Sequence, residues 1–129
     1  MNKVNKLNSL GVWLQFTYGA EEISFPNDGA NCTFKYKDEI RNLPIQYFDI
    51  ESDGFIFNKS TFDVDSIIQI TQSYLAIINV ELLRKSLATH RKHVIKRGDG
   101  LMEAPRELVT DIIRIIFYEP LDGIQKNKN

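Results

Sequence analysis

The sequence predicts an α+β fold: an N-terminal antiparallel sheet of four or five strands, followed by two or three helices packed on one face of that sheet. Apolar and polar residues alternate with a period of two in the first half of the chain, whereas apolar residues recur every three or four positions in the second half. The length of 129 residues fits a single domain over 1–129. Residues 1–10 and 125–129 are predicted to be mobile ends, because they are polar and rich in asparagine.

The predicted strands lie between residues 11 and 58. Val12, Leu14 and Phe16 occupy alternate positions, as apolar residues do on one face of a strand. Residues 33–37 alternate strictly between polar and aromatic side chains, and aromatic side chains favour strands. The alternation therefore predicts a strand for each of these segments.

Two glycine-containing segments are predicted to be turns. Residues 27–29 have the sequence Asn-Asp-Gly, and residues 53–54 have the sequence Asp-Gly. Glycine adopts a positive φ without steric cost, and a two-residue Asp-Gly loop matches the twist of a hairpin. We therefore expect residues 53–54 to join strands over 45–51 and 55–58 as a hairpin.

Helical spacing dominates the second half of the chain. Apolar residues over 64–94 recur at three and four positions, and Gly98 beyond them favours the end of a helix. The pattern leaves open whether 63–97 is one helix or two, with Asn79 as the cap of the second helix in the latter case. Pro105 is predicted to begin a last helix, because the first helical turn does not use the N–H that proline lacks.

Composition excludes several classes of protein. The 16 Lys and Arg against 17 Asp and Glu leave a formal net charge of -1, so no global basic field would hold nucleic acid or an anionic membrane. The single cysteine, Cys32, can form neither an internal disulfide nor a structural zinc site by itself. The apolar runs are far shorter than the roughly 20 residues of a spanning helix, and residues 1–10 lack the apolar core of a signal peptide. We therefore expect a soluble cytoplasmic protein.

No catalytic, metal or cofactor motif is recognisable. His90 and His93 lie three residues apart, but the sequence offers no third ligand at a set spacing, and Arg91 and Lys92 between them would repel a cation. Cys32 has no basic neighbour that would lower the pKa of its thiol. Glycine-rich phosphate loops are absent from the sequence. The sequence therefore predicts a protein without enzymatic activity, cofactor, metal or small-molecule substrate.

The first half of the chain is acidic. Residues 20–65 hold ten Asp or Glu against four Lys or Arg. An acidic surface attracts a basic protein partner and speeds its association. The alternative is that these acids occupy turns and pair with basic residues of the same molecule. The residues predicted to bind the partner are Asp49, Glu51, Asp53, Asp63 and Asp65.

The segment 84–97 is basic, with six Lys or Arg and no acid. On a helix these side chains would form one positive face that could contact phosphates in a small nucleic-acid-binding or regulatory protein. The alternative is a solvated helix face whose cations are favoured near the C-terminus by the helix dipole. The residues predicted for phosphate binding in this alternative function are Arg84, Arg91, Lys92 and Lys96.

In size, charge, lack of motifs and richness in Asn, Lys and Ile, the chain resembles the immunity proteins of bacterial contact-dependent growth inhibition and related toxin systems. The resemblance implies a cytoplasmic protein that binds one cognate toxin domain, often a nuclease, and occludes its active site. The acidic residues would then mimic nucleic-acid phosphates in the basic cleft of the toxin. A subunit of a larger assembly, formed through an exposed sheet edge, is a further alternative.

Overall fold

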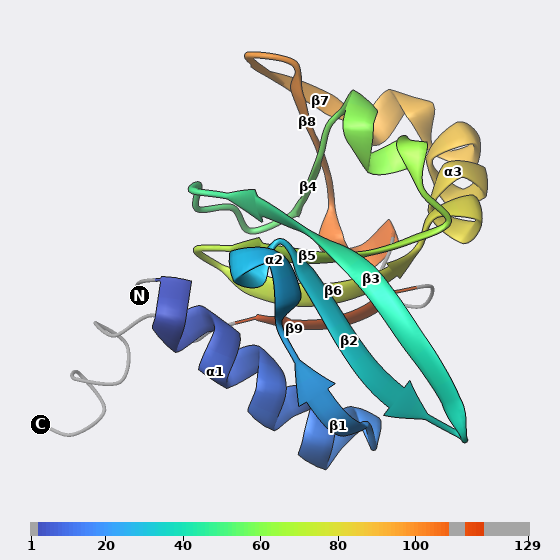
Figure 1. The fold of residues 1–129 in the computed structure, drawn as a ribbon. Coiled ribbons are helices and arrows are strands. Elements are labelled where there is room, and N and C mark those ends of the chain that lie inside the picture. The colour runs from blue at the N-terminus through green and yellow to red at the C-terminus, as the bar shows by residue number, and fades with distance from the viewer. Residues whose placement is uncertain (1–2, 109–112, 118–129) are drawn as a thin grey trace, which may run out of the picture.

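The computed structural model describes residues 3–108 and 113–117, which form a mixed α+β fold (Figure 1). The helices are α1 Lys3–Trp13, α2 Pro26–Gly29 and α3 Val80–Thr89, with a π-helical turn Leu14–Tyr18 and 3₁₀ turns Lys59–Asp63, Arg91–His93 and Arg106–Leu108. The strands are β1 Glu21–Ser24, β2 Asn31–Tyr36, β3 Glu39–Phe48, β4 Phe55–Phe57, β5 Ser66–Thr71, β6 Tyr74–Asn79, β7 Ile95–Gly98, β8 Leu101–Ala104 and β9 Ile113–Phe117.

These strands build two sheets. The large sheet has six strands in the order β1-β2-β3-β5-β6-β9, and the small sheet has three in the order β4-β8-β7. Strand β3 pairs with β5 in parallel, and the other strand pairs are antiparallel. The α+β class is thus confirmed, but the predicted order of strands followed by helices is wrong, because strands extend to β9 and a helix precedes β1.

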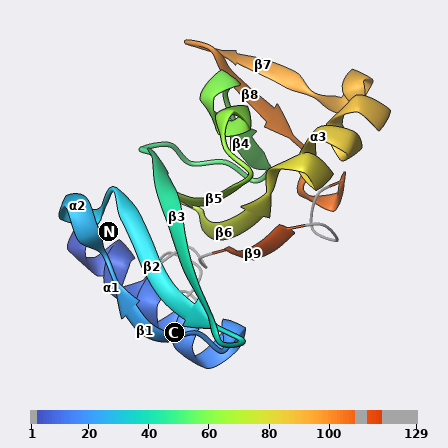
Figure 2. The ribbon, with the colours of Figure 1, turned by 45° about the vertical axis from the view of Figure 1, so that its right-hand side comes forward.

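The large sheet separates two apolar cores. On one face, Leu10 and Leu14 from α1 and the turn after it pack with Ile68, Ile70 and their neighbours. On the other face, α3 contributes Leu83 to a cluster with strands β4 and β8 and with the opposite side chains of β5 and β6. Figure 2 shows α1 beside β1 and β2, away from α3. The prediction that helices cover one face is therefore wrong.

Strands β5 and β6 replace the helix predicted over 64–78. Both faces of these strands are buried, so Ile67 and Ile68 are equally inaccessible although they point in opposite directions. A strand buried on both sides lacks the alternation of a surface strand, and its apolar residues can fall at helical spacing. The isoleucine content was the better signal, because β-branched residues favour strands.

The N-terminal strand predicted around Val12 is also wrong. Helix α1 and the π-helical turn occupy this segment, and Leu7, Leu10 and Leu14 recur at three and four positions toward the core. Val12 and Phe16 alternate with Leu14, but they are exposed on the outer side of the helical segment. Three alternating residues are too few to distinguish a strand from two faces of a helix.

The predicted turn over 27–29 is confirmed, because α2 is a single turn in which Asn27 and Asp28 have left-handed backbone angles. The predicted hairpin at residues 53–54 is wrong, since β3 pairs with β2 and β5 whereas β4 pairs with β8. The Asp-Gly hairpin instead lies at residues 99–100 between β7 and β8, with φ of 53° and 77°. Residues 37–38 form a second two-residue hairpin turn with positive φ.

Helix α3 begins and ends within the segment predicted as 63–97. The Asn79 side chain accepts a hydrogen bond from the Leu82 N–H at 3.1 Å, which confirms the predicted cap. The helix ends at Thr89, so the predicted helical face over 84–97 does not form. Residues 95–97 belong to strand β7 instead. The helix predicted from Pro105 is a 3₁₀ turn followed by β9, where isoleucines again favour a strand. The predicted mobile residues 125–129 lie outside the described part of the chain.

None of the helices in the described ranges has the length and apolar character needed to cross a membrane.

Candidate functional site

The acidic residues predicted to bind a partner fall into two separate groups. Asp49, Glu51 and Asp53 lie in the connection between β3 and β4, whereas Asp63 and Asp65 lie directly before β5. Asp49 accepts a hydrogen bond from the side chain of Gln72, just beyond the other end of β5. Because β5 spans about 20 Å at roughly 3.3 Å per residue, the five carboxylates do not form one patch.

The first group is a short run of exposed acids. Asp49, Glu51 and Asp53 are exposed, whereas Ile50 and Ser52 between them are half-buried. The three carboxylates are therefore all accessible to solvent from one connecting segment. We call residues 49–53 the acidic loop.

Hydrogen bonds to the backbone fix the acidic loop to two strand ends. The carbonyl oxygen of Ile50 accepts from the Gln72 N–H at 3.1 Å, in the turn between β5 and β6. The carbonyl oxygen of Glu51 accepts from Arg97 Nη1 at 3.2 Å, and that of Asp53 accepts from Arg106 Nε at 2.9 Å. Both arginines thus bind the backbone of the loop, whose Glu51 and Asp53 side chains remain exposed.

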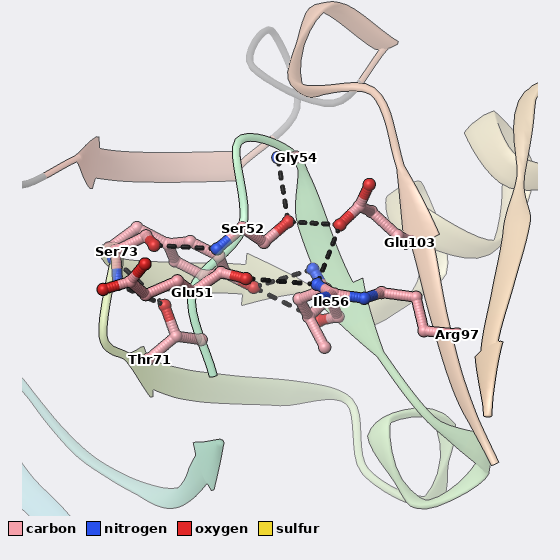
Figure 3. A network of polar contacts seen from close by, with 9 residues as sticks. Glu51, Ser52, Gly54, Ile56, Thr71, Ser73, Arg97 and Glu103 are labelled. Atoms are coloured by element: carbon pink, nitrogen blue, oxygen red, sulfur yellow. Dashed lines mark hydrogen bonds and ion pairs between the residues drawn. The ribbon is translucent and has the colours of Figure 1, made fainter. Parts of the chain in front are cut away.

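The half-buried Ser52 fixes the acidic loop to the rest of the fold through hydrogen bonds (Figure 3). Its N–H donates to Ser73 Oγ at 2.9 Å, and its own Oγ accepts from the Gly54 N–H at 3.0 Å. The same hydroxyl bonds to the carboxylate of Glu103 on β8, which Arg97 Nη1 holds at 3.0 Å. Ser73 is held in turn by Thr71, whose hydroxyl accepts the Ser73 N–H at 3.0 Å. The network joins the loop to both sheets.

The hydrogen bond between the Ser52 hydroxyl and the Glu103 carboxylate is the kind of contact that a nucleophile makes with its general base. The Glu103 carboxylate accepts hydrogen bonds from both the Ser52 hydroxyl and Arg97 Nη1. The Ser52 hydroxyl donates to Glu103 and accepts from the Gly54 N–H, so it bridges the acidic loop to β8. These contacts therefore hold the acidic loop against β8.

Gly54 closes the loop against β8. A Cβ at this position would overlap the carbonyl oxygen of Ala104, so the close approach of the two strands requires glycine. Beside this contact lies an open hollow of about 560 Å³ with both apolar and charged walls. Its lining residues are Asp53, Gly54, Ile95, Glu103, Pro105, Arg106 and Glu107.

The second acidic group has cations close by. Asp63 and Asp65 line a hollow of about 260 Å³ together with Arg84 and Lys85 from α3. Arg84 donates to the carbonyl oxygen of Phe62 at 3.2 Å, and its guanidinium lies 5.6 Å from the centre of the Phe62 ring. The second acidic group thus lies beside two cations of α3, although Lys85 forms its ion pair with Glu81.

The predicted phosphate-binding residues are also divided. Arg84 lies in α3 beside Asp63, whereas Arg91 and Lys92 lie in the 3₁₀ turn after α3 and Lys96 lies on β7. Arg84 is thus separated from the other three, which remain exposed. The predicted continuous helix cannot serve as their common support.

The remaining candidates for chemistry have structural roles. Burial raises the pKa of the Cys32 thiol to about 12, so the thiolate is scarce at neutral pH. The rings of His90 and His93 lie 6.2 Å apart. Within the described ranges, no three His, Cys, Asp or Glu side chains are grouped so that they could hold a metal ion.

A buried chain of polar side chains was missed from the sequence. Gln69 donates to Gln46 Oε1 at 2.8 Å and accepts from the Tyr74 hydroxyl at 2.8 Å, and Thr61 donates to the same Gln46 oxygen at 2.9 Å. Gln69, Thr61 and Tyr74 are fully buried. Glutamine within an isoleucine-rich segment was the available signal, since a buried amide requires hydrogen-bond partners.

Comparisons with protein-family models, with curated proteins and with solved structures found no match to this chain.

Proposed function

We propose that this protein is a non-enzymatic binding protein that neutralises a cognate bacterial toxin domain, a nuclease, by covering its active site. The acidic loop would lie in the basic cleft of the toxin, where Asp49, Glu51 and Asp53 take the place of nucleic-acid phosphates. The observation that carries the proposal is the set of three exposed carboxylates on a backbone held by hydrogen bonds.

A fixed loop favours binding for an energetic reason. Ordering a flexible loop on association costs free energy, and a loop that is already ordered avoids part of this cost. The carboxylates of Glu51 and Asp53 have no ion-pair partner among the described residues, where the ion pairs join Lys85 to Glu81 and Arg97 to Glu103. A basic partner would therefore gain attraction from these carboxylates.

The test begins with the protein encoded beside this one, purified as a candidate toxin. An equimolar amount of this protein is expected to abolish its nuclease activity. The variant Glu51→Lys with Asp53→Lys is expected to slow association at least tenfold and to make it less sensitive to salt. Stopped-flow fluorescence at several salt concentrations measures both effects.

The matched control is Asp63→Lys with Asp65→Lys, which changes the net charge equally at the other end of β5. We expect less than a threefold change in the association rate for this control. Equal slowing by both variants would indicate a general field and would exclude the acidic loop as the binding element. Full activity of the nuclease with excess protein would exclude the toxin as the partner.

A further inference from the structure

We propose that Arg91, Lys92 and Lys96 form a second binding surface, for the phosphate backbone of duplex nucleic acid. We call these three residues the basic edge. Strand β7 is the outer strand of the small sheet, and the 3₁₀ turn Arg91–His93 leads into it. The proposal is independent of the proposed toxin binding, because the basic edge and the acidic loop share no residue.

The basic edge is exposed and carries unbalanced charge. All three side chains are exposed, and the sequence has no acid between Arg84 and Gly98. Within the part of the chain that the structure describes, none of the three has an ion-pair partner, in contrast to Lys85 and Arg97. Their charge is therefore available to an external anion.

Alternation along β7 keeps the basic edge apart from the acidic loop. Ile95 lines the hollow that contains Asp53 and pairs with Glu103, so it faces the acidic loop. Lys96 follows Ile95 before the register of the two strands shifts, and it pairs with Met102, which packs against the core beneath α3. Cross-strand partners share a face, so Lys96 points away from the acidic loop.

The helix dipole explains only part of this arrangement. Arg91 and Lys92 directly follow the C-terminus of α3, where cations are favoured by about 0.3–1 kcal/mol each. That effect decays within the last helical turn, so it does not account for an unpaired Lys96 on the next strand. A common ligand accounts for all three cations.

The shape and composition of the surface favour a nucleic-acid backbone. The hairpin of β7 and β8 projects from the rest of the fold in Figures 1 and 2, and because β4 covers the other edge of β8, the outer edge of β7 is the edge left open to a partner as large as a duplex. No aromatic residue lies between Arg84 and Gly98 to stack on unpaired bases. The exposed Ile95 faces the acidic loop, so no apolar side chain on the basic edge itself would insert into a membrane.

Three neutralised phosphates set the size of the expected salt effect. The logarithm of affinity for duplex DNA falls with the logarithm of salt by about 0.9 per phosphate, which gives a slope of about 2.7 for three contacts. Raising the salt concentration threefold is therefore expected to weaken binding about 20-fold. A single lysine removed from such a surface is expected to reduce the slope by about one.

The test measures the binding of the full chain to a fluorescein-labelled duplex DNA by anisotropy, at low salt and at threefold higher salt. The basic-edge variant carries Arg91→Gln, Lys92→Gln and Lys96→Gln. We expect its affinity at low salt to fall at least tenfold and its slope to fall below one. The wild-type protein should show the full 20-fold salt effect.

The matched control carries Lys37→Gln, Lys59→Gln and Lys85→Gln, which removes the same charge from exposed lysines elsewhere. We expect less than a threefold change in its affinity. Equal loss in the two triple variants, or no binding of the wild-type protein to duplex at low salt, overturns the proposal. Tighter binding to polyglutamate or to vesicles with anionic lipid than to duplex also overturns it, in favour of an acidic protein or a membrane.

If the basic-edge variant does not fold, substitutions at Lys96 alone still test the proposal. Lys96→Gln is expected to lower the salt slope by about one, whereas Lys96→Arg is expected to preserve it, because both changes leave the β-strand contacts and only the first removes the charge. Circular dichroism confirms that each variant is folded. An unchanged slope in folded Lys96→Gln would overturn the assignment of Lys96.

Discussion

The hydroxyl of Tyr74 is buried between strand β4 and the middle of the large sheet, and its removal has a defined cost. It accepts a hydrogen bond from the Ile56 N–H at 2.9 Å and donates to Gln69 Oε1 at 2.8 Å, with the Ile56 carbonyl oxygen also in reach at 3.2 Å. Tyr74 has no exposed surface, so solvent cannot replace these bonds. The Tyr74 hydroxyl thereby bonds the backbone N–H and carbonyl oxygen of Ile56, as a neighbouring strand would do at this edge of β4.

The change Tyr74→Phe leaves the ring in place and removes both bonds. The Ile56 N–H loses its acceptor, and Gln69 Oε1 loses its donor, in an interior that water does not reach. A buried polar group left without a partner costs about 1–3 kcal/mol. Two such groups, less the desolvation of the deleted hydroxyl, give an expected loss of about 2–4 kcal/mol in the free energy of unfolding.

Urea unfolding followed by circular dichroism measures this loss. The control is Tyr36→Phe, since Tyr36 is half-buried with its ring 4.5 Å from that of Tyr18, and the change preserves this contact. We expect the control to lose less than about 0.5 kcal/mol. A loss below about 1 kcal/mol for Tyr74→Phe would refute the reasoning, because the hydroxyl would then have no essential partner in the folded protein.

Three further predictions concern the acidic loop, helix α3 and the core. Gly54→Ala should lower the free energy of unfolding by about 1–3 kcal/mol, since its Cβ would overlap the Ala104 carbonyl oxygen; an unchanged urea midpoint would contradict the close approach. Asn79→Ala should cost about 0.5–2 kcal/mol by removing the cap on the Leu82 N–H, and Asn79→Ser should restore most of it in the same measurement. Burial raises the pKa of the Cys32 thiol in the folded state, so its contribution is complete below pH 9 and is lost as the pH rises toward 12. Relative to Cys32→Ala, the wild-type protein should lose at most about 1.4 kcal/mol per pH unit above pH 9, and parallel pH profiles would exclude this effect.

Local chemistry was sufficient to predict some elements from the sequence. Strand β2 followed from strict alternation over 33–37 and the turn over 27–29 from its Asn-Asp-Gly sequence. These features depend on neighbours within a few residues, and such neighbours act in the same way whatever the rest of the chain does. Asn79 was a cap in only one of the two alternatives for 63–97, and the structure decides in its favour.

Partners far apart in the chain were beyond prediction. The acidic loop is held by Arg97, which lies 46 residues from Glu51, and by Glu103, which lies 51 residues from Ser52. No local pattern specifies such pairs, because they depend on the small sheet placing β8 beside the loop. The same distance effect explains why Asp63 and Arg84 lie together while Asp49 lies at the other end of β5.

By itself the sequence determined the α+β class, strand β2 and the turn over 27–29, because these depend on backbone preferences and on alternation within short segments. Tertiary structure alone decided that residues 64–78 are strands, because burial on both faces removes the contrast between apolar and polar sides that reveals a strand. It also decided which of two Asp-Gly pairs forms a hairpin. The segments that flank residues 99–100 pair with each other, whereas the segments that flank residues 53–54 each pair with a different strand.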